Sequence, residues 1–208
     1  CAACAPGTFS SSPGASTCEL CAVGGYCPDA GASSSLVYRQ CAAGTYNPER
    51  GSDSVSACLL CPAGTANPVP GSSSNASCLP CLPGGVSPLA GAGLCTLCAA
   101  GKWQGTSGQT ACQNCTTGYL CVEGASAPQP CPAGRHANQT VLSTTGFLRT
   151  LDDCVVCPEG TFCPVGSAAP RNCAPGTFNP NASAEVCTNC EAGTFQDEAG
   201  QTACMSCT

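Results

Sequence analysis

The sequence predicts a small disulfide-rich repeat fold, an elongated array of short irregular β-hairpins and turns with almost no helix. The first observation is the presence of 24 cysteines among 208 residues, a density typical of disulfide scaffolds. The second is a short motif around these cysteines that recurs along the whole chain. The third is the scarcity of aromatic side chains, at 5% of residues, so cross-links must replace much of the apolar burial that stabilises other proteins.

The repeat organises residues 1–208 into eleven modules, each of which opens with a cysteine that is followed three residues later by glycine. An aromatic residue stands five residues after this cysteine in seven of the modules. We therefore expect one continuous tandem array, without a domain linker, that is a fragment of a longer chain. The opening cysteines are Cys4, Cys21, Cys41, Cys61, Cys81, Cys98, Cys115, Cys131, Cys157, Cys173 and Cys190.

Each module is expected to fold as a tight turn followed by a return strand. In the pattern Cys-x-x-Gly-Thr-Phe, the glycine supplies a backbone conformation that a Cβ atom would penalise, and the ring is expected to cover a disulfide. Gly, Pro, Ser and Asn interrupt every apolar period, so a helix of any length is not expected.

Regular loop lengths predict the simple disulfide bridges, in which the second cysteine of a Cys-x-x-Cys pair bonds the first cysteine of the next pair. The closed loops hold 13 or 16 residues, and a bridge over such a loop contributes about 3 kcal/mol by restricting the unfolded chain. Cys1 and Cys207 are left over, and we expect their partners in flanking modules. The predicted bridges are Cys4–Cys18, Cys41–Cys58, Cys61–Cys78, Cys81–Cys95, Cys98–Cys112, Cys173–Cys187 and Cys190–Cys204.

Three modules carry an additional cysteine and end on a single one, and their pairing stays open at this point. In the first of them, Cys21 can bond Cys27 locally, or Cys21 can bond Cys41 while Cys27 bonds Cys58. The crossed form closes first loops of 19, 15 and 15 residues in the three modules. These lengths are closer to those of the other modules and favour the crossed form. The other two modules use Cys115, Cys121 and Cys131, and Cys157, Cys163 and Cys173.

Composition and charge exclude several classes of function. The net charge is −6 with only 6 Lys and Arg, which argues against a nucleic-acid partner because phosphate binding needs clustered basic side chains. No run of 18 apolar residues is present, so we expect no membrane insertion in this segment. Cysteines at this density indicate an extracellular location, secreted or at the cell surface, where disulfides persist.

We expect no enzyme activity, no metal and no cofactor. Paired Cys-x-x-Cys units match zinc-ribbon spacing, but the lone cysteines and the glycine and aromatic pattern favour disulfides. The single histidine, His136, falls in the ring position, where it is most simply a substituted aromatic residue. No Ser or Cys nucleophile is paired with a base in the sequence.

Four Asn-x-Ser/Thr sequons predict N-glycosylation. Asn75, Asn138 and Asn181 lie between cysteines in the middle of predicted loops, where a glycan would be accessible. Asn114 lies inside a Cys-x-x-Cys pair, and occupancy is least expected there.

One loop departs from the repeat, since 22 residues separate Cys131 from Cys154. It is the longest loop and the most apolar. Exposed apolar side chains often mark a contact with another molecule, so we nominate this loop as an interaction site. Folding of the loop back over its own neighbours is the alternative. The nominated side chains are Val141, Leu142, Phe147, Leu148 and Leu151.

Several segments resemble the cysteine-rich repeat called ephrin-receptor-like, which is similar in style to the modules of tumour-necrosis-factor receptors. They are Cys-Ala-Pro-Gly-Thr-Phe at 4–9 and 173–178, Cys-Ala-Ala-Gly-Thr-Tyr at 41–46 and Cys-Pro-Glu-Gly-Thr-Phe-Cys-Pro at 157–164. The cysteine pairing that the resemblance implies agrees with the loop-closing bridges above. Arrays of this kind occur in animal receptor ectodomains and, in long runs, in secreted and surface proteins of algae and other protists.

The uninterrupted repetition and the small side chains favour a structural role over ligand recognition. We expect an extracellular glycoprotein segment that forms a stalk, a fibre or the spine of a surface filament. Its expected partners are further copies of itself, flanking modules of the same chain, and glycans. The alternative is a protein-ligand-binding ectodomain of a cell-surface receptor or adhesion protein, for which energetic hot spots should gather in a few exposed loops.

Overall fold

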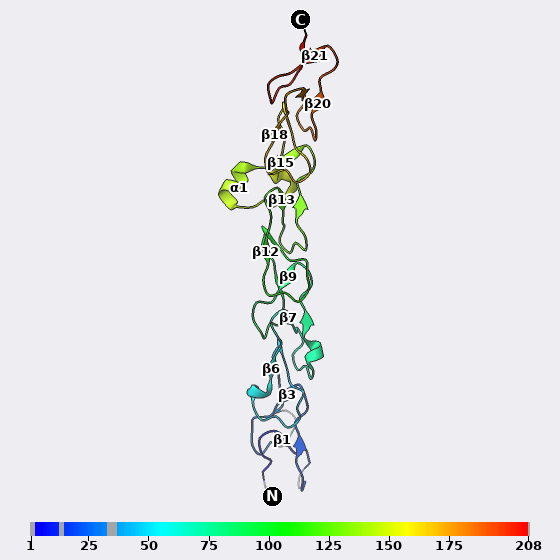
Figure 1. The fold of residues 1–208 in the computed structure, drawn as a ribbon. Coiled ribbons are helices and arrows are strands. Elements are labelled where there is room, and N and C mark those ends of the chain that lie inside the picture. Colours follow the sequence, from blue (N-terminus) through cyan, green and yellow to red (C-terminus); the bar gives the residue numbers. More distant parts are fainter. Residues whose placement is uncertain (1–2, 13–14, 33–36, 208) are drawn as a thin grey trace. The chain divides into compact units, whose positions relative to one another are not determined.

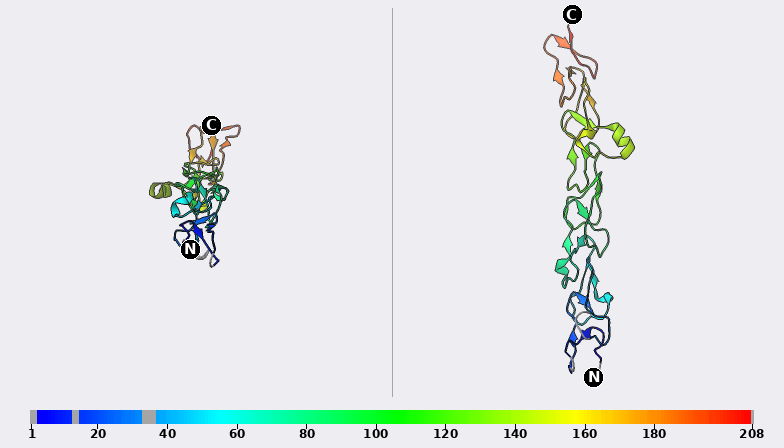
Figure 2. Two further views of the ribbon diagram at one scale, coloured as in Figure 1. Left: turned by 90° about the horizontal axis from the view of Figure 1, so that it is seen from below. Right: turned by 180° about the vertical axis from the view of Figure 1, so that it is seen from behind.

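Short antiparallel hairpins make up almost all the regular structure of the computed structural model, which describes residues 3–12, 15–32 and 37–207. The chain forms two compact units, unit 1 (Cys1–Leu97 with Thr106–Cys112) and unit 2 (Cys98–Gly105 with Gln113–Thr208). Within each unit the hairpins follow one another in chain order (Figures 1 and 2). The predicted class, a disulfide-rich array of short hairpins, is confirmed.

Within the described residues the strands pair two by two in chain order, and each pair belongs to one module. In unit 1 the pairs are β1 (Thr8–Phe9) with β2 (Glu19–Leu20), β3 (Gly25–Tyr26) with β4 (Arg39–Gln40), β5 (Thr45–Tyr46) with β6 (Leu59–Leu60), β7 (Thr65–Ala66) with β8 (Leu79–Pro80), and β9 (Gly85–Val86) with β10 (Thr96–Leu97). In unit 2 they are β11 (Lys102–Trp103) with β12 (Gln113–Asn114), β13 (Tyr119–Leu120) with β14 (Gln129–Pro130), β15 (Arg135–Ala137) with β16 (Cys154–Val156), β17 (Thr161–Phe162) with β18 (Arg171–Asn172), β19 (Thr177–Phe178) with β20 (Thr188–Asn189), and β21 (Thr194–Phe195) with β22 (Met205–Ser206). The helical segments are η2 (Val55–Ala57) and η3 (Asn75–Ser77) in unit 1, and α1 (Gln139–Thr145) and η4 (Leu151–Asp153) in unit 2.

The disulfides form most of the core, because the opening cysteines are buried in nearly every module. Both cysteines of the predicted Cys98–Cys112 bridge are disulfide-bonded as well. The other loop-closing bridges are Cys4–Cys18, Cys41–Cys58, Cys61–Cys78, Cys81–Cys95, Cys131–Cys154, Cys173–Cys187 and Cys190–Cys204. Cys207 is exposed and has no bridge to another described residue, and Cys1 lies outside the described residues.

The three modules with an additional cysteine use the local pairing, so the crossed form that loop length favours is not the one present. Their bridges are Cys21–Cys27, Cys115–Cys121 and Cys157–Cys163. The physical reason is that the usual partner of the opening cysteine is absent from these three modules. In the other modules the opening cysteine bonds the cysteine three residues before the next opening cysteine, and in these three modules Tyr38, Pro128 or Pro170 stands there.

Tyr38 fills the place of the missing cysteine in the second module. Its hydroxyl donates a hydrogen bond to the Val23 carbonyl oxygen at 2.9 Å, and a Cβ atom on Gly25 would lie 2.6 Å from its ring. Burial of the phenol raises the pKa of Tyr38 above its ordinary value. The phenol therefore holds the end of this module in contact with its beginning, as a bridge does elsewhere.

One backbone hydrogen bond joins nine of the modules to the module before each of them. A residue with positive φ in the second half of a module donates its N–H to the carbonyl oxygen of the preceding opening cysteine, at 2.7 to 2.9 Å. This residue is glycine in most modules, and in one module it is Ser183, with φ 69°. The pairs are Gly31 to Cys4, Gly51 to Cys21, Gly71 to Cys41, Gly91 to Cys61, Gly108 to Cys81, Gly124 to Cys98, Gly166 to Cys131, Ser183 to Cys157 and Gly200 to Cys173.

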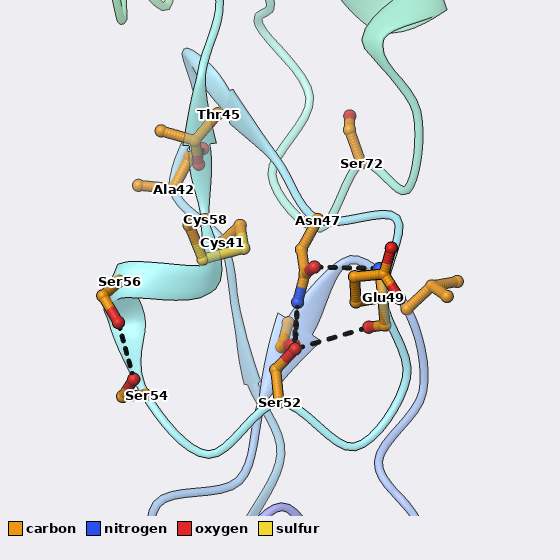
Figure 3. The surroundings of a disulfide bond; sticks show 12 residues. Cys41, Ala42, Thr45, Asn47, Glu49, Ser52, Ser54, Ser56, Cys58 and Ser72 are labelled. Carbon is orange, nitrogen blue, oxygen red and sulfur yellow. Dashed lines mark hydrogen bonds between the residues drawn. A yellow bond between two sulfur atoms is a disulfide. The ribbon is translucent and has the colours of Figure 1, made fainter.

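A buried asparagine, which the sequence interpretation did not single out, makes a second link between modules. Asn47 is 0% exposed, and its Nδ2 donates to the Gly25 carbonyl oxygen at 2.8 Å and to Ser52 Oγ at 2.9 Å. Its Oδ1 accepts the N–H of Glu49 at 3.0 Å. Figure 3 shows Asn47 between the chain segments beside the Cys41–Cys58 bridge. Asn67 and Asn179 repeat this arrangement in their own modules.

We expect Asn47→Ala to destabilise unit 1 by about 2 to 4 kcal/mol, because it removes three hydrogen bonds and leaves the Gly25 carbonyl oxygen buried without its donor. Thermal unfolding with the disulfides intact measures this loss. Asn189→Ala, at an exposed strand position, serves as the control and should change the midpoint little. Equal midpoints for the two variants would contradict a structural role for Asn47.

Candidate interaction and modification sites

The loop between Cys131 and Cys154 contains the α-helix that the sequence did not predict. Asn138 caps α1, because its Oδ1 accepts the N–H groups of Thr140 and Val141, and Gly146 ends the helix in the left-handed conformation. In Figures 1 and 2, α1 projects from the side of its unit. Leu148 is 0% exposed and forms an apolar cluster with Leu120, Cys131, Ala137 and Cys154.

Most of the side chains nominated in this loop are turned inward rather than exposed. Val141 and Leu142 pack against the apolar cluster. Phe147 is half-buried and lies where a Cβ atom on Gly101 would overlap its ring. Only Leu151, at 55%, is exposed. The loop therefore folds back over its neighbours, and the predicted open apolar surface is reduced to Leu151.

The structure places the four sequons in different surroundings. Asn75, Asn114 and Asn181 are exposed, on η3, on β12 and in a loop. Asn138 is half-buried because its Oδ1 caps α1. Asn114, the site at which the sequence favours occupancy least, is thus exposed, as Asn75 and Asn181 are.

The chemistry-bearing residues named from the sequence are not brought together. His136 lies on β15, half-buried, with Nδ1 2.9 Å from the Ala137 carbonyl oxygen. Among residues 3–12, 15–32 and 37–207, no three His, Cys, Asp or Glu side chains form a group that could hold a metal ion. Over the same residues, no helix is long and apolar enough to cross a membrane.

An apolar groove on unit 1 is the surface that sequence reasoning missed. A hollow of about 500 Å³ lies between β8 and β10, lined mainly by Leu79, Pro80, Leu82, Pro83, Leu94 and Leu97. The four leucines of this hollow are 58 to 76% exposed, and the neighbouring Leu89 is 78% exposed. We call this surface the leucine groove. A signal was available, because these leucines occupy module positions that are small or polar in most other modules.

Comparison with known proteins shows that the last modules of the chain are similar to one family. A family model described as "Tyrosine-protein kinase ephrin type A/B receptor-like" matches residues 176–208. No curated protein matches the chain. Modules of this disulfide-rich kind are typical of extracellular domains. The chain is therefore a cysteine-rich repeat array whose residues 176–208 are similar to the ephrin-receptor-like module.

Proposed function

We propose that this chain is a non-catalytic structural segment of a secreted or cell-surface glycoprotein, where it forms a stalk, a fibre or the spine of a surface filament. The observation that carries the proposal is the hydrogen bond that recurs from module to module at 2.7 to 2.9 Å. An array in which nearly every module offers its neighbour the same donor and acceptor can be lengthened with contacts of the same kind.

The composition of the surface supports the same role. Only 9% of the residues are charged, and the sequons at Asn75, Asn114 and Asn181 are exposed, so glycans can solubilise a surface that has few charges. The disulfides suit an extracellular place, where they are not reduced. Bridged modules also present few unfolded segments to proteases.

We expect electron microscopy of the purified native protein to show long regular fibres. The reason is that repeated, similar surfaces favour head-to-tail contacts that do not close into rings. A mass measurement on the same sample under non-reducing conditions should show the disulfides intact and N-linked glycan added. Short particles that stay dispersed at every protein concentration would contradict the structural role.

The second candidate is a receptor or adhesion ectodomain that binds a protein ligand. One observation favours it, since α1 and the exposed Leu151 interrupt the repeat at a single place in unit 2. A ligand for this surface would lose affinity when Leu151 is replaced by Asp, while fibres of the structural kind would still assemble. The pair of measurements separates the two functions.

A further inference from the structure

The leucine groove lies at positions where the fold does not need leucine. The two residues before an opening cysteine are exposed in ten of the eleven described hairpins. Both residues are polar in four of these hairpins, as in Arg-Gln at 39–40, Gln-Asn at 113–114 and Arg-Asn at 171–172. Leucine occurs in Glu-Leu at 19–20, Leu-Leu at 59–60, Leu-Pro at 79–80 and Thr-Leu at 96–97, and the last two pairs belong to the groove. Leu82 stands where five other modules have alanine. Polar or small residues support the same hairpin elsewhere, so the fold does not explain these leucines.

Two hollows lie next to each other on this surface and share one exposed leucine. Beside the hollow of about 500 Å³ lies a second hollow of about 320 Å³, and Leu94 lines both of them. Leu94 is 76% exposed and is shared by the walls of the two hollows. In a two-fold contact, the exposed Leu94 of one molecule can enter a hollow of the other while the reverse contact forms at the same time.

The distribution of charge also favours a second copy as the partner. Residues 54–101 contain no charged side chain, although the whole chain carries a net charge of −6. Two identical molecules of this net charge repel each other over most of their surfaces. Contact through the leucine groove brings no like charges together, whereas a charged partner would gain no ion pair there.

We propose that the leucine groove joins two copies of this chain side by side, as a symmetric contact in which Leu79, Leu82, Leu94 and Leu97 of each copy are buried against the other. The inference rests on the proposed structural function and adds the surface through which chains associate laterally. Burial of exposed leucines supplies the free energy of association, as for the apolar centre of other interfaces.

Sedimentation equilibrium of the 208-residue chain, produced through an oxidising secretory route, tests the proposal. We expect a monomer–dimer equilibrium for the wild-type chain. Leu79→Thr combined with Leu97→Asn should weaken dimerisation more than tenfold, since a few buried apolar side chains carry most of the energy of an interface. The matched control is Met205→Thr combined with Leu20→Asn, which changes the same two module positions outside the groove and should leave dimerisation unchanged.

Leu82→Glu is a second variant with a different readout. Glu191 occupies the same module position, so the hairpin tolerates glutamate there. Across a symmetric contact, the two introduced charges should repel each other, and the loss of dimer should therefore be larger at low salt than at high salt. A salt-independent effect, or none, would overturn the symmetric contact.

Three results would overturn the inference: a wild-type chain that stays monomeric, equal weakening by the groove and control variants, or binding of the groove to neutral phosphatidylcholine vesicles in place of a second copy. The outcome is separate from that of the proposed function. Fibres that form without the dimer would remove the inference alone, and a dimer without fibres would remove the structural function alone.

Discussion

Full reduction of the disulfides should unfold the chain under otherwise native conditions, whereas a metal chelator should leave it folded. Each bridge contributes about 3 kcal/mol, and 22 cysteines are bonded in this way. Their combined contribution exceeds the 5 to 15 kcal/mol by which folded domains are usually stable. Apolar burial cannot replace it, because the buried apolar side chains are mostly the cysteines themselves.

Limited proteolysis and amide hydrogen exchange measure this effect, with free thiols counted by mass on the same samples. After treatment with a phosphine reductant, we expect cleavage throughout both units and loss of protection at the N–H groups that link modules, such as that of Gly71. The chelator-treated sample is the control. Unfolding by chelator alone would indicate metal-bound thiolates, and persistent protection in the fully reduced chain would show that the hairpins do not depend on their bridges.

The repeat and the simple bridges could be predicted from the sequence, since a fixed spacing of Cys and Gly determines both. Loop length could not identify the local bridges, because what determines them is the loss of the cysteine that stands three residues before the next opening cysteine in the other modules. Wherever a cysteine follows the ring, the cysteine three residues before the next module is absent, and Tyr38 is one of the residues in its place. The opening cysteine therefore has a single nearby partner, Cys27 in the case of Cys21.

The buried asparagines and the helix were missed for a related reason. Asn47 stands six residues after an opening cysteine, where the modified modules have Cys27 or Cys121. Because this position holds asparagine in some modules and a bridged cysteine in others, it is a buried position. This is seen only when the modules are compared with one another. For α1, Asn138 at its start and Gly146 at its end are ordinary helix boundary residues, but with only 7 residues the helix is too short to show an apolar period.

Gly44→Ala should be the most destabilising single substitution at a module turn that leaves every bridge intact. Gly44 has φ 84°, which costs a residue with a Cβ atom about 1 to 2 kcal/mol. The added methyl group would also overlap the carbonyl oxygen of Gly91, two modules further along the chain. Because a backbone atom cannot turn aside as a side chain can, we expect a total loss of about 4 kcal/mol or more.

The matched control is Gly193→Ala, which isolates the contact between modules from the strain in the turn. Gly193 has φ 86°, but a Cβ atom there meets no atom within 4 Å. The control should therefore cost only the strain of the turn, about 1 to 2 kcal/mol. Thermal unfolding with intact disulfides gives the difference in stability, and hydrogen exchange at the Gly91 N–H, which donates to Cys61 at 2.8 Å, locates it. If the two variants lost equal stability, the strain of the turn would explain both losses. The close backbone packing between alternate modules would then make no contribution to the stability of the array.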